Sequence, residues 1–97
     1  MYVLSGMFVL TELERLVKQI KGDARVRRVG TSRSGSWIVN EYQVEGLSYK
    51  KLIKLDNAAR RQLKYKLKKK LGTNAVFIRV GIRANNKGQV LIGYKKK

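Results

Sequence analysis

The chain has 97 residues, with 23 basic and 6 acidic side chains and a net charge of +17, and it contains no cysteine and no histidine. Those two absences exclude a disulfide framework and remove the usual zinc ligands and the commonest general base. The hydrophobic fraction of 43% is typical of a small folded domain, so we treat residues 1–97 as a single domain.

The first predicted element is a helix over 11–21. Leu13, Val17 and Ile20 recur at helical spacing after Thr11, whose hydroxyl would cap the helix. The apolar start before it is too short to span a bilayer and is a poor export signal, which favours a cytoplasmic protein without a membrane segment. This start is instead a candidate homodimer interface, because a small core can leave it uncovered. Its apolar residues are Val3, Leu4, Met7 and Phe8.

A β-hairpin is predicted next, with strands over 24–31 and 36–45. β-branched and aromatic residues from Val26 to Val44 favour the strands. The stretch "TSRSGS" between them is rich in serine and glycine, which is typical of a turn. Arg33 lies in this turn, where it could bind a phosphate, although a plain hairpin turn is the simpler account.

The segment 48–71 has a helical pattern, and we predict two pieces with a break near Asp56 and Asn57. Ser48 would cap the first piece, and Gly72 suits the stop after the second. Apolar residues recur every four positions along one predicted stripe. The stripe consists of Leu55, Ala59, Leu63, Leu67 and Leu71.

A second hairpin follows, with one strand in "AVFIRVGIRA" and the other in "QVLIGY". Alternation places Val76 and Ile78 on one face and Phe77 and Arg79 on the other. The connecting "NNKG" is a strong turn signal, and it carries Lys87 at its tip. A basic tail ends the sequence at 95–97.

The order α-β-β-α-β-β predicts an α+β fold, in which two helices pack on one face of a four-stranded antiparallel sheet. The two halves also look alike, so 11–45 and 57–94 are candidates for an internal duplication, although any two helix–hairpin units share some similarity. Gly22, Gly30 and Tyr42 match Gly72, Gly81 and Tyr94, and Leu13 and Val17 match Leu63 and Leu67. A winged helix-turn-helix is the alternative fold, with helices at 48–54 and 58–71 and a wing at 76–94.

Charge is unevenly distributed along the chain. Residues 1–56 carry 10 basic and 6 acidic side chains, whereas residues 57–97 carry 13 basic side chains and no acidic one. Such an excess costs stability through self-repulsion, which a polyanionic partner would relieve. DNA or RNA is the commonest partner of this kind. An anionic membrane is a weaker candidate, because the aromatic residues do not gather on a basic amphipathic helix.

The stretch "RRQLKYKLKKK" at 60–70 is the first candidate binding surface, because a solvated helix face usually mixes charges of both signs. The strand arginines form a second candidate, since they would crowd a sheet face that no helix covers. Trp37 would join them there and could stack on bases, although a place in the core or a subunit interface is the simpler account. The candidate nucleic-acid-binding residues are Arg25, Arg27, Arg33, Trp37, Arg60, Arg61, Lys64, Lys66, Lys68, Lys69, Lys70, Arg79, Arg83 and Lys87.

No catalytic motif accompanies these residues. Glu41 and Glu45 share a strand face but lie well apart, and no phosphate-binding loop or nucleophile pattern occurs. We therefore predict a non-catalytic protein without metal or cofactor, which binds the phosphate backbone of nucleic acid with limited sequence specificity. The alternatives are a winged-helix DNA-binding regulator that uses 57–71 as its recognition helix, and an RNA-bound component of a ribosome or nucleoid.

Overall fold

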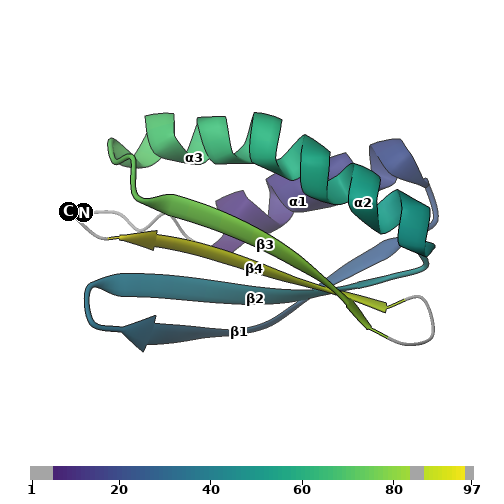
Figure 1. Ribbon diagram of the computed structural model, residues 1–97, viewed down its shortest axis with the longest axis horizontal. Coiled ribbons are helices and arrows are strands. Elements are labelled where there is room, and N and C mark those ends of the chain that lie inside the picture. Colours follow the sequence, from purple (N-terminus) through teal and green to yellow (C-terminus); the bar gives the residue numbers. More distant parts are fainter. Residues whose placement is uncertain (1–5, 84–86, 96–97) are drawn as a thin grey trace.

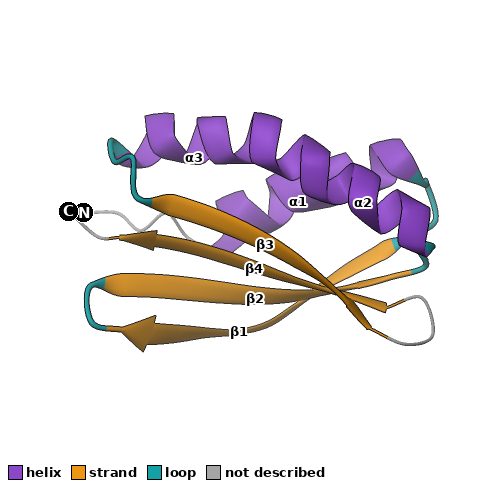
Figure 2. Ribbon diagram, in the orientation of Figure 1, coloured by secondary structure: helices purple, strands orange, loops and turns teal. Residues whose placement is uncertain are grey.

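The computed structural model describes residues 6–83 and 87–95. A helix and a hairpin are followed by a longer helical segment and a second hairpin (Figure 1, Figure 2). In chain order the elements are α1 (Gly6–Ile20), β1 (Arg25–Ser34), β2 (Trp37–Glu45), α2 (Tyr49–Ala58), the π-helix η1 (Ala59–Leu63), α3 (Lys64–Leu71), β3 (Val76–Arg83) and β4 (Lys87–Lys95).

The four strands form one antiparallel sheet in the order β1-β2-β4-β3, so the two hairpins meet through their second strands. The helices all lie on one face of this sheet, as Figure 1 shows. α1 packs against β1, whereas α2 and α3 pack against β3. The predicted α+β class with a four-stranded antiparallel sheet is therefore confirmed.

The helix α1 begins at Gly6 rather than at Thr11. Val9, Leu13 and Val17 are all fully buried, so the apolar stripe that holds α1 on the sheet starts before the predicted cap. The prediction of an N-cap at Thr11 is wrong, because the additional apolar residues extend the helix toward the N-terminus.

The candidate dimer interface rested on four apolar residues near the start of the chain. Phe8 packs against the core of its own chain, and the ammonium group of Lys70 lies 5.3 Å from the centre of its ring. Val3, Leu4 and the side chain of Met7 lie outside the described residues. The dimer stays a prediction, and one of its proposed contact residues already has an intramolecular role.

One continuous helical rod, residues 49–71, runs through α2, η1 and α3 (Figure 1). The break predicted near Asp56 and Asn57 is therefore wrong. Ser48 does cap the rod at its start, and Gly72 ends it in the left-handed conformation with φ of 66°, as predicted. A helix-turn-helix needs a turn between its two helices. None interrupts residues 49–71, all of which are described, so the winged-helix arrangement lacks its central feature.

The π-helix η1 explains how a stripe with a spacing of four residues stays buried. In an α-helix, residues four apart drift around the axis by about 40° at each step. In η1 the turn is wider, because the backbone N–H of Lys64 donates to the carbonyl oxygen of Ala59, five residues earlier. Only the last member of the predicted stripe, Leu71, stays partly exposed. The buried members are Leu55, Ala59, Leu63 and Leu67.

The first hairpin has a longer first strand and a shorter turn than predicted. β1 continues to Ser34, and the turn consists of Gly35 and Ser36 alone. Gly35 has φ of 61°, and positive φ is what two-residue hairpin turns require at this position. The loop predicted over "TSRSGS" is wrong, because most of it is strand and Arg33 pairs with Ile38 of β2.

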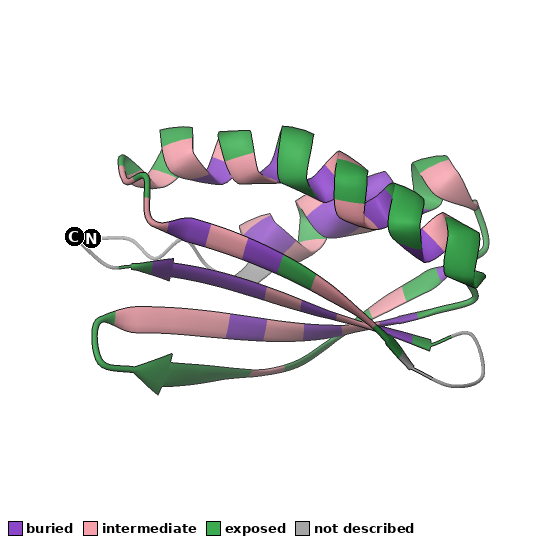
Figure 3. Cartoon of the chain, in the orientation of Figure 1, coloured by how far each residue is buried: buried purple, intermediate pink, exposed green. Residues whose placement is uncertain are grey.

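The core lies between the sheet and the helices (Figure 3). Its fully buried strand residues include Val44, Val90 and Ile92, and burial of each such side chain stabilises the fold by about 1.5–3 kcal/mol. Leu52 of α2 lies directly over Gly88 of β4, where a Cβ atom would come within 2.5 Å of the leucine Cδ2. The glycine therefore lets the helical rod approach the sheet closely.

Tyr42 occupies the centre of this core and is 0% exposed. Its hydroxyl has no hydrogen-bond partner among the described residues. Burial raises the pKa of Tyr42 to about 12, although the nearby charge of Arg28 acts in the opposite direction. A buried hydroxyl left without a partner costs on the order of 1–3 kcal/mol. The hydroxyl of Tyr42 therefore destabilises the fold, whereas the burial of its ring stabilises it.

Candidate nucleic-acid interface

The predicted binding residues form two surfaces on opposite sides of the molecule rather than one. The helical rod carries seven of them. These are Arg60, Arg61, Lys64, Lys66, Lys68, Lys69 and Lys70. The sheet face turned away from the helices, which we call the open face, carries a second set (Figure 1). That set is Arg25, Arg27, Trp37, Arg79 and Lys87.

The strand register assigns the sheet residues to their face, because side chains alternate along a strand. Tyr42 is buried under the helices, so the adjacent Gln43 and its cross-strand partner Arg27 point away from them. Arg33 pairs with Ile38, which packs against the core. Arg33 therefore lies on the helix side of the sheet at the hairpin end, apart from the other strand arginines.

The rod is more basic than the predicted residues alone imply. Residues 49–71 contain ten basic side chains and one acidic one, Asp56. Three of the ten, all on α2, were missed by the sequence prediction. They are Lys50, Lys51 and Lys54. The sequence could have predicted their outward orientation, because they flank the buried Leu52 at spacings that turn them toward solvent.

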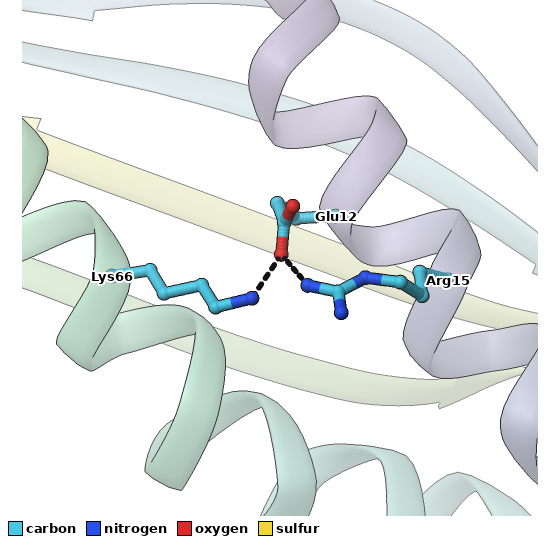
Figure 4. A network of polar contacts seen from close by, with 3 residues as sticks. All are labelled: Glu12, Arg15 and Lys66. Atoms are coloured by element: carbon cyan, nitrogen blue, oxygen red, sulfur yellow. Dashed lines mark hydrogen bonds and ion pairs between the residues drawn. The ribbon is translucent and has the colours of Figure 1, made fainter.

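One carboxylate from α1 reaches the rod. Glu12 Oε1 accepts a hydrogen bond from Lys66 Nζ at 2.8 Å and another from Arg15 of its own helix (Figure 4). The side chain of Glu12 is 18% exposed, and the hydrogen bond from Lys66 is the main reason why the pKa of Glu12 is lowered despite desolvation. The prediction that this basic stretch lacks counter-charge is therefore wrong for Lys66.

Three further cations of the rod also have partners, and one of them is Lys69, whose ammonium group lies 5.7 Å from the centre of the Tyr65 ring. Arg60 Nε donates to Asp56 Oδ1 at 2.9 Å, one turn earlier in the rod. Lys70 contacts the face of the Phe8 ring, which is a cation–π interaction. Lys66 and Lys70 are four residues apart, and so are their partners in α1, Glu12 and Phe8. The two contacts hold α1 and α3 side by side, and they direct both lysines toward α1 rather than toward a partner molecule.

The cations that remain face away from α1. Lys64 and Lys68 lie about 200° around the helix from Lys66, and Arg61 precedes them by roughly one turn. No carboxylate among the described residues pairs with any of these three, which we call the outer stripe. Lys69 lies beside the outer stripe. The outer stripe is therefore a part of the positive surface of the rod that lacks carboxylate compensation.

The open face carries an aromatic pair at one end. The ring centres of Trp37 and Phe77 are 5.5 Å apart, with an angle of 53° between their planes. Gly93 makes room for this arrangement, because a Cβ atom there would come within 2.2 Å of Phe77 Cε2. Phe77 therefore lies on the backbone of β4 and extends the ring of Trp37 into a broader apolar surface. Val39 and Leu91, both partly exposed, adjoin it on the same face.

The other end of the open face is polar and internally connected. Arg27 Nη2 donates to Gln43 Oε1 at 2.8 Å, and Gln43 Nε2 donates to Glu45 Oε2 at 3.2 Å. Lys87 Nζ lies 4.0 Å from the same carboxylate oxygen. Gln89 Nε2 donates to Glu41 Oε2 at 2.7 Å. At this end Lys87 has a carboxylate partner and Arg27 an amide partner, unlike the cations of the outer stripe.

A shallow groove of about 360 Å³ runs between these polar side chains. Arg27, Glu41, Gln43, Lys87 and Gln89 line it, together with Val29, Tyr42 and Gly88. The two glutamines were not predicted as binding residues. Strand alternation could have identified them, since both share the outward parity of Trp37 and Leu91. Lys87 was expected in the turn but is the first residue of β4. Residues 84–86 of that turn and the side chain of Arg83 lie outside the described part.

Within residues 6–83 and 87–95, no cluster of three or more acidic side chains could hold a metal ion. None of the helices in that part of the chain is long and apolar enough to cross a membrane. Comparisons with protein-family models, with curated proteins and with solved structures give no match. The two surfaces themselves therefore provide the evidence for a function.

Proposed function

We propose that this chain is a non-catalytic nucleic-acid-binding protein, and that the outer surface of the helical rod is its main phosphate contact. The observation that carries the proposal is the outer stripe, Arg61, Lys64 and Lys68, which has no carboxylate partner among the described residues. Like charges spaced three and four residues apart on a helix destabilise it. A row of phosphates would turn that repulsion into attraction and release condensed counterions.

The chemistry of this surface favours affinity over sequence discrimination. Lysine ammonium groups bind phosphate as point charges on flexible stems, whereas base recognition relies on planar or amide groups held against base edges. The rod has eight lysines and offers Asn57 and Gln62 as its only side-chain amides. Its contacts would position a nucleic acid without selecting its sequence.

Binding to labelled DNA and RNA, each as duplex and as single strand, tests the proposal. Fluorescence anisotropy over a range of salt concentrations should give a linear fall of log K with log salt, with a slope near −0.9 for each phosphate contacted in a duplex. Lys68→Gln should reduce the magnitude of the slope by about one. Lys18→Gln, which removes an equal charge from the exposed side of α1, is the matched control and should leave it nearly unchanged.

A chain that binds none of these ligands at low salt is not a nucleic-acid-binding protein. Equal changes for Lys68→Gln and Lys18→Gln would show that only net charge matters and that the rod has no special part in binding. The DNA and RNA series also separate a DNA-binding protein from an RNA-bound assembly component, since only the latter would bind RNA selectively.

We also propose that the two helix–hairpin halves descend from one duplicated unit. Leu13 and Leu63 are both buried in their helices, and Tyr42 and Tyr94 are both buried in the second strand of their hairpin. The second strands pair with each other at the centre of the sheet, as expected for two like units in a symmetric arrangement. A superposition of the halves whose best fit pairs Leu13 with Leu63 and Tyr42 with Tyr94 would support the duplication, and any other pairing would contradict it.

A further inference from the structure

The open face of the sheet has chemistry that the helical rod lacks, although both are basic. It combines an aromatic pair at one end with a groove at the other, whose lining includes amides, a carboxylate and cations. We propose that this face binds unpaired bases, so that the chain holds single-stranded nucleic acid on its sheet. The inference rests on the proposed function, because it names a further ligand class for the same nucleic-acid-binding chain.

The aromatic end offers a surface on which a base can stack. The Trp37 and Phe77 rings lie 5.5 Å apart, and Gly93 lets Phe77 lie directly on the sheet instead of standing away from it. Arg79 follows Phe77 by two residues on the same strand and face. An aromatic surface beside an arginine suits a base and its phosphate together, and stacking accepts any base because each has a π-face.

The polar end offers hydrogen-bonding groups that suit base edges. Gln43 and Gln89 present amides, and Glu41 accepts hydrogen bonds at the rim of the same groove. Each already contacts a neighbour, which holds it in a defined position. Amides can contact adenine in two places, and a carboxylate can accept from the amino group of cytosine. An unpaired base also exposes its Watson–Crick edge to such groups, whereas base pairing occupies that edge in a duplex.

The charge of the open face favours a nucleic acid over a second copy of this chain. Among the described residues the face carries five cations and two carboxylates, a net charge of +3. The cations are Arg25, Arg27, Arg79, Lys87 and Lys95, and the carboxylates are Glu41 and Glu45. Two copies packed face to face would bring these excess positive charges together, whereas the phosphates of a single strand would neutralise them.

Trp37 makes the proposal directly measurable, because it is the only tryptophan in the chain. The probes are a 12-nucleotide unpaired strand and a hairpin duplex with the same number of phosphates. Stacking on Trp37 should quench its emission when the unpaired strand is added to the unmodified protein. The duplex, held by the outer stripe on the opposite side, should bind with little change in emission.

Phe77→Leu is the matching variant, since it keeps an apolar side chain but removes the π-face. Affinity for the unpaired strand should fall by roughly 5- to 150-fold, the usual range for one stacked base, while affinity for the duplex stays constant. The control is Tyr65→Leu, which removes an exposed aromatic ring from the rod. This control should leave the ratio of single-strand to duplex affinity unchanged.

The possible outcomes separate the two proposals. If neither probe binds at low salt, the proposed function fails and this inference fails with it. If the duplex binds while the unpaired strand leaves Trp37 emission unaltered, only the open-face inference is overturned. It is also overturned if Phe77→Leu and Tyr65→Leu have the same effect on the affinity for the unpaired strand and on the affinity for the duplex. A third contradictory outcome is a dimer that buries Trp37 and that still sediments as a dimer when the unpaired strand is bound.

Discussion

The helical rod and the open face of the sheet are both basic, but their charges are arranged differently. On the rod, the outer stripe of Arg61, Lys64 and Lys68 has no carboxylate partner among the described residues. On the open face, Arg27 and Lys87 belong to a network that includes Gln43 and Glu45. The comparison teaches that the number of cations is a poor guide to function, and that the groups around each cation decide what it can bind.

The largest expected effect is the loss of duplex affinity when three positive charges are removed from the rod, compared with the loss when three are removed from the open face. Arg61→Gln, Lys64→Gln and Lys68→Gln together should lower duplex affinity by up to about 500-fold at 0.1 M salt, because about three phosphate contacts are lost. The matched control is the triple variant Arg25→Gln, Arg27→Gln and Lys87→Gln, which removes the same charge from the open face.

Anisotropy titrations with the hairpin duplex provide the measurement for both triple variants. The control should lower duplex affinity much less than the rod variant. An equal loss would break the comparison, because it would mean that duplex binding follows net charge rather than the rod.

A second test uses two glycines on the open face. Gly93→Ala should destabilise the fold by about 1–3 kcal/mol, since its Cβ would overlap the Phe77 ring at 2.2 Å. Gly81→Ala is the control, because a Cβ there meets Gln89 only at 3.8 Å, an ordinary contact. Urea unfolding followed by the emission of Trp37 measures both. If the two substitutions cost the same, Phe77 does not lie on the sheet as described.

A third test removes the carboxylate that pairs with Lys66 of the rod. Glu12→Gln frees Lys66, so duplex affinity should rise by up to about eightfold at 0.1 M salt and the salt dependence should steepen by about one phosphate contact. Stability should fall by less than about 1 kcal/mol, because Lys66 and Arg15 are substantially exposed. Anisotropy and urea unfolding measure the two effects, and an unchanged affinity would argue against the rod as the phosphate contact.

The same carboxylate gives a pH dependence. The pKa of Glu12 is lowered in the folded state, so its contribution to stability is present above the ordinary carboxyl pKa and is lost as pH falls through the lowered value. Unmodified protein should therefore lose more stability than Glu12→Gln on acidification below about pH 4. Parallel acid titrations that coincide would contradict the ion pair.

A further test concerns Tyr42, which belongs to neither surface and should affect stability alone. Tyr42→Phe should raise stability by about 1 kcal/mol at neutral pH, because it removes a buried hydroxyl without a described partner. Nucleic-acid affinity should not change, so the variant separates stability from binding. A clear loss of stability at neutral pH would show that the hydroxyl has a partner after all.

Tyr42 also predicts an alkaline limit. Its pKa of about 12 lies above the ordinary tyrosine value near 10, so its contribution to stability is complete below pH 10 and is lost as pH rises through 12. That loss amounts to about 2–3 kcal/mol. Comparing unmodified protein with Tyr42→Phe from pH 9 to 12 isolates it, since the lysines titrate in both. Identical curves would mean that Tyr42 is not buried in the folded chain.

Local patterns in the sequence predicted most of the fold. Alternation in the strands placed Phe77 and Arg79 on the face opposite Val76, and Ser48 and Gly72 marked the ends of the rod. These predictions succeeded because caps and strand faces depend on residues close together in the chain. The break near Asp56 was wrong because polar residues can cap a helix or simply face outward within one, and only packing on the sheet distinguishes the two.

The candidate site shows the same difference between features that depend on residues close together in the chain and features that depend on packing. The sequence by itself determined the large positive charge, its concentration after residue 57, and the periodicity that turns the lysines of the rod outward. Only the tertiary structure decided that Glu12 compensates Lys66, and that Gln43 and Gln89 share a groove with Arg27. The physical reason is range. Charge and periodicity are local properties of the chain, whereas a counter-charge 54 residues away becomes a neighbour only when the helices pack.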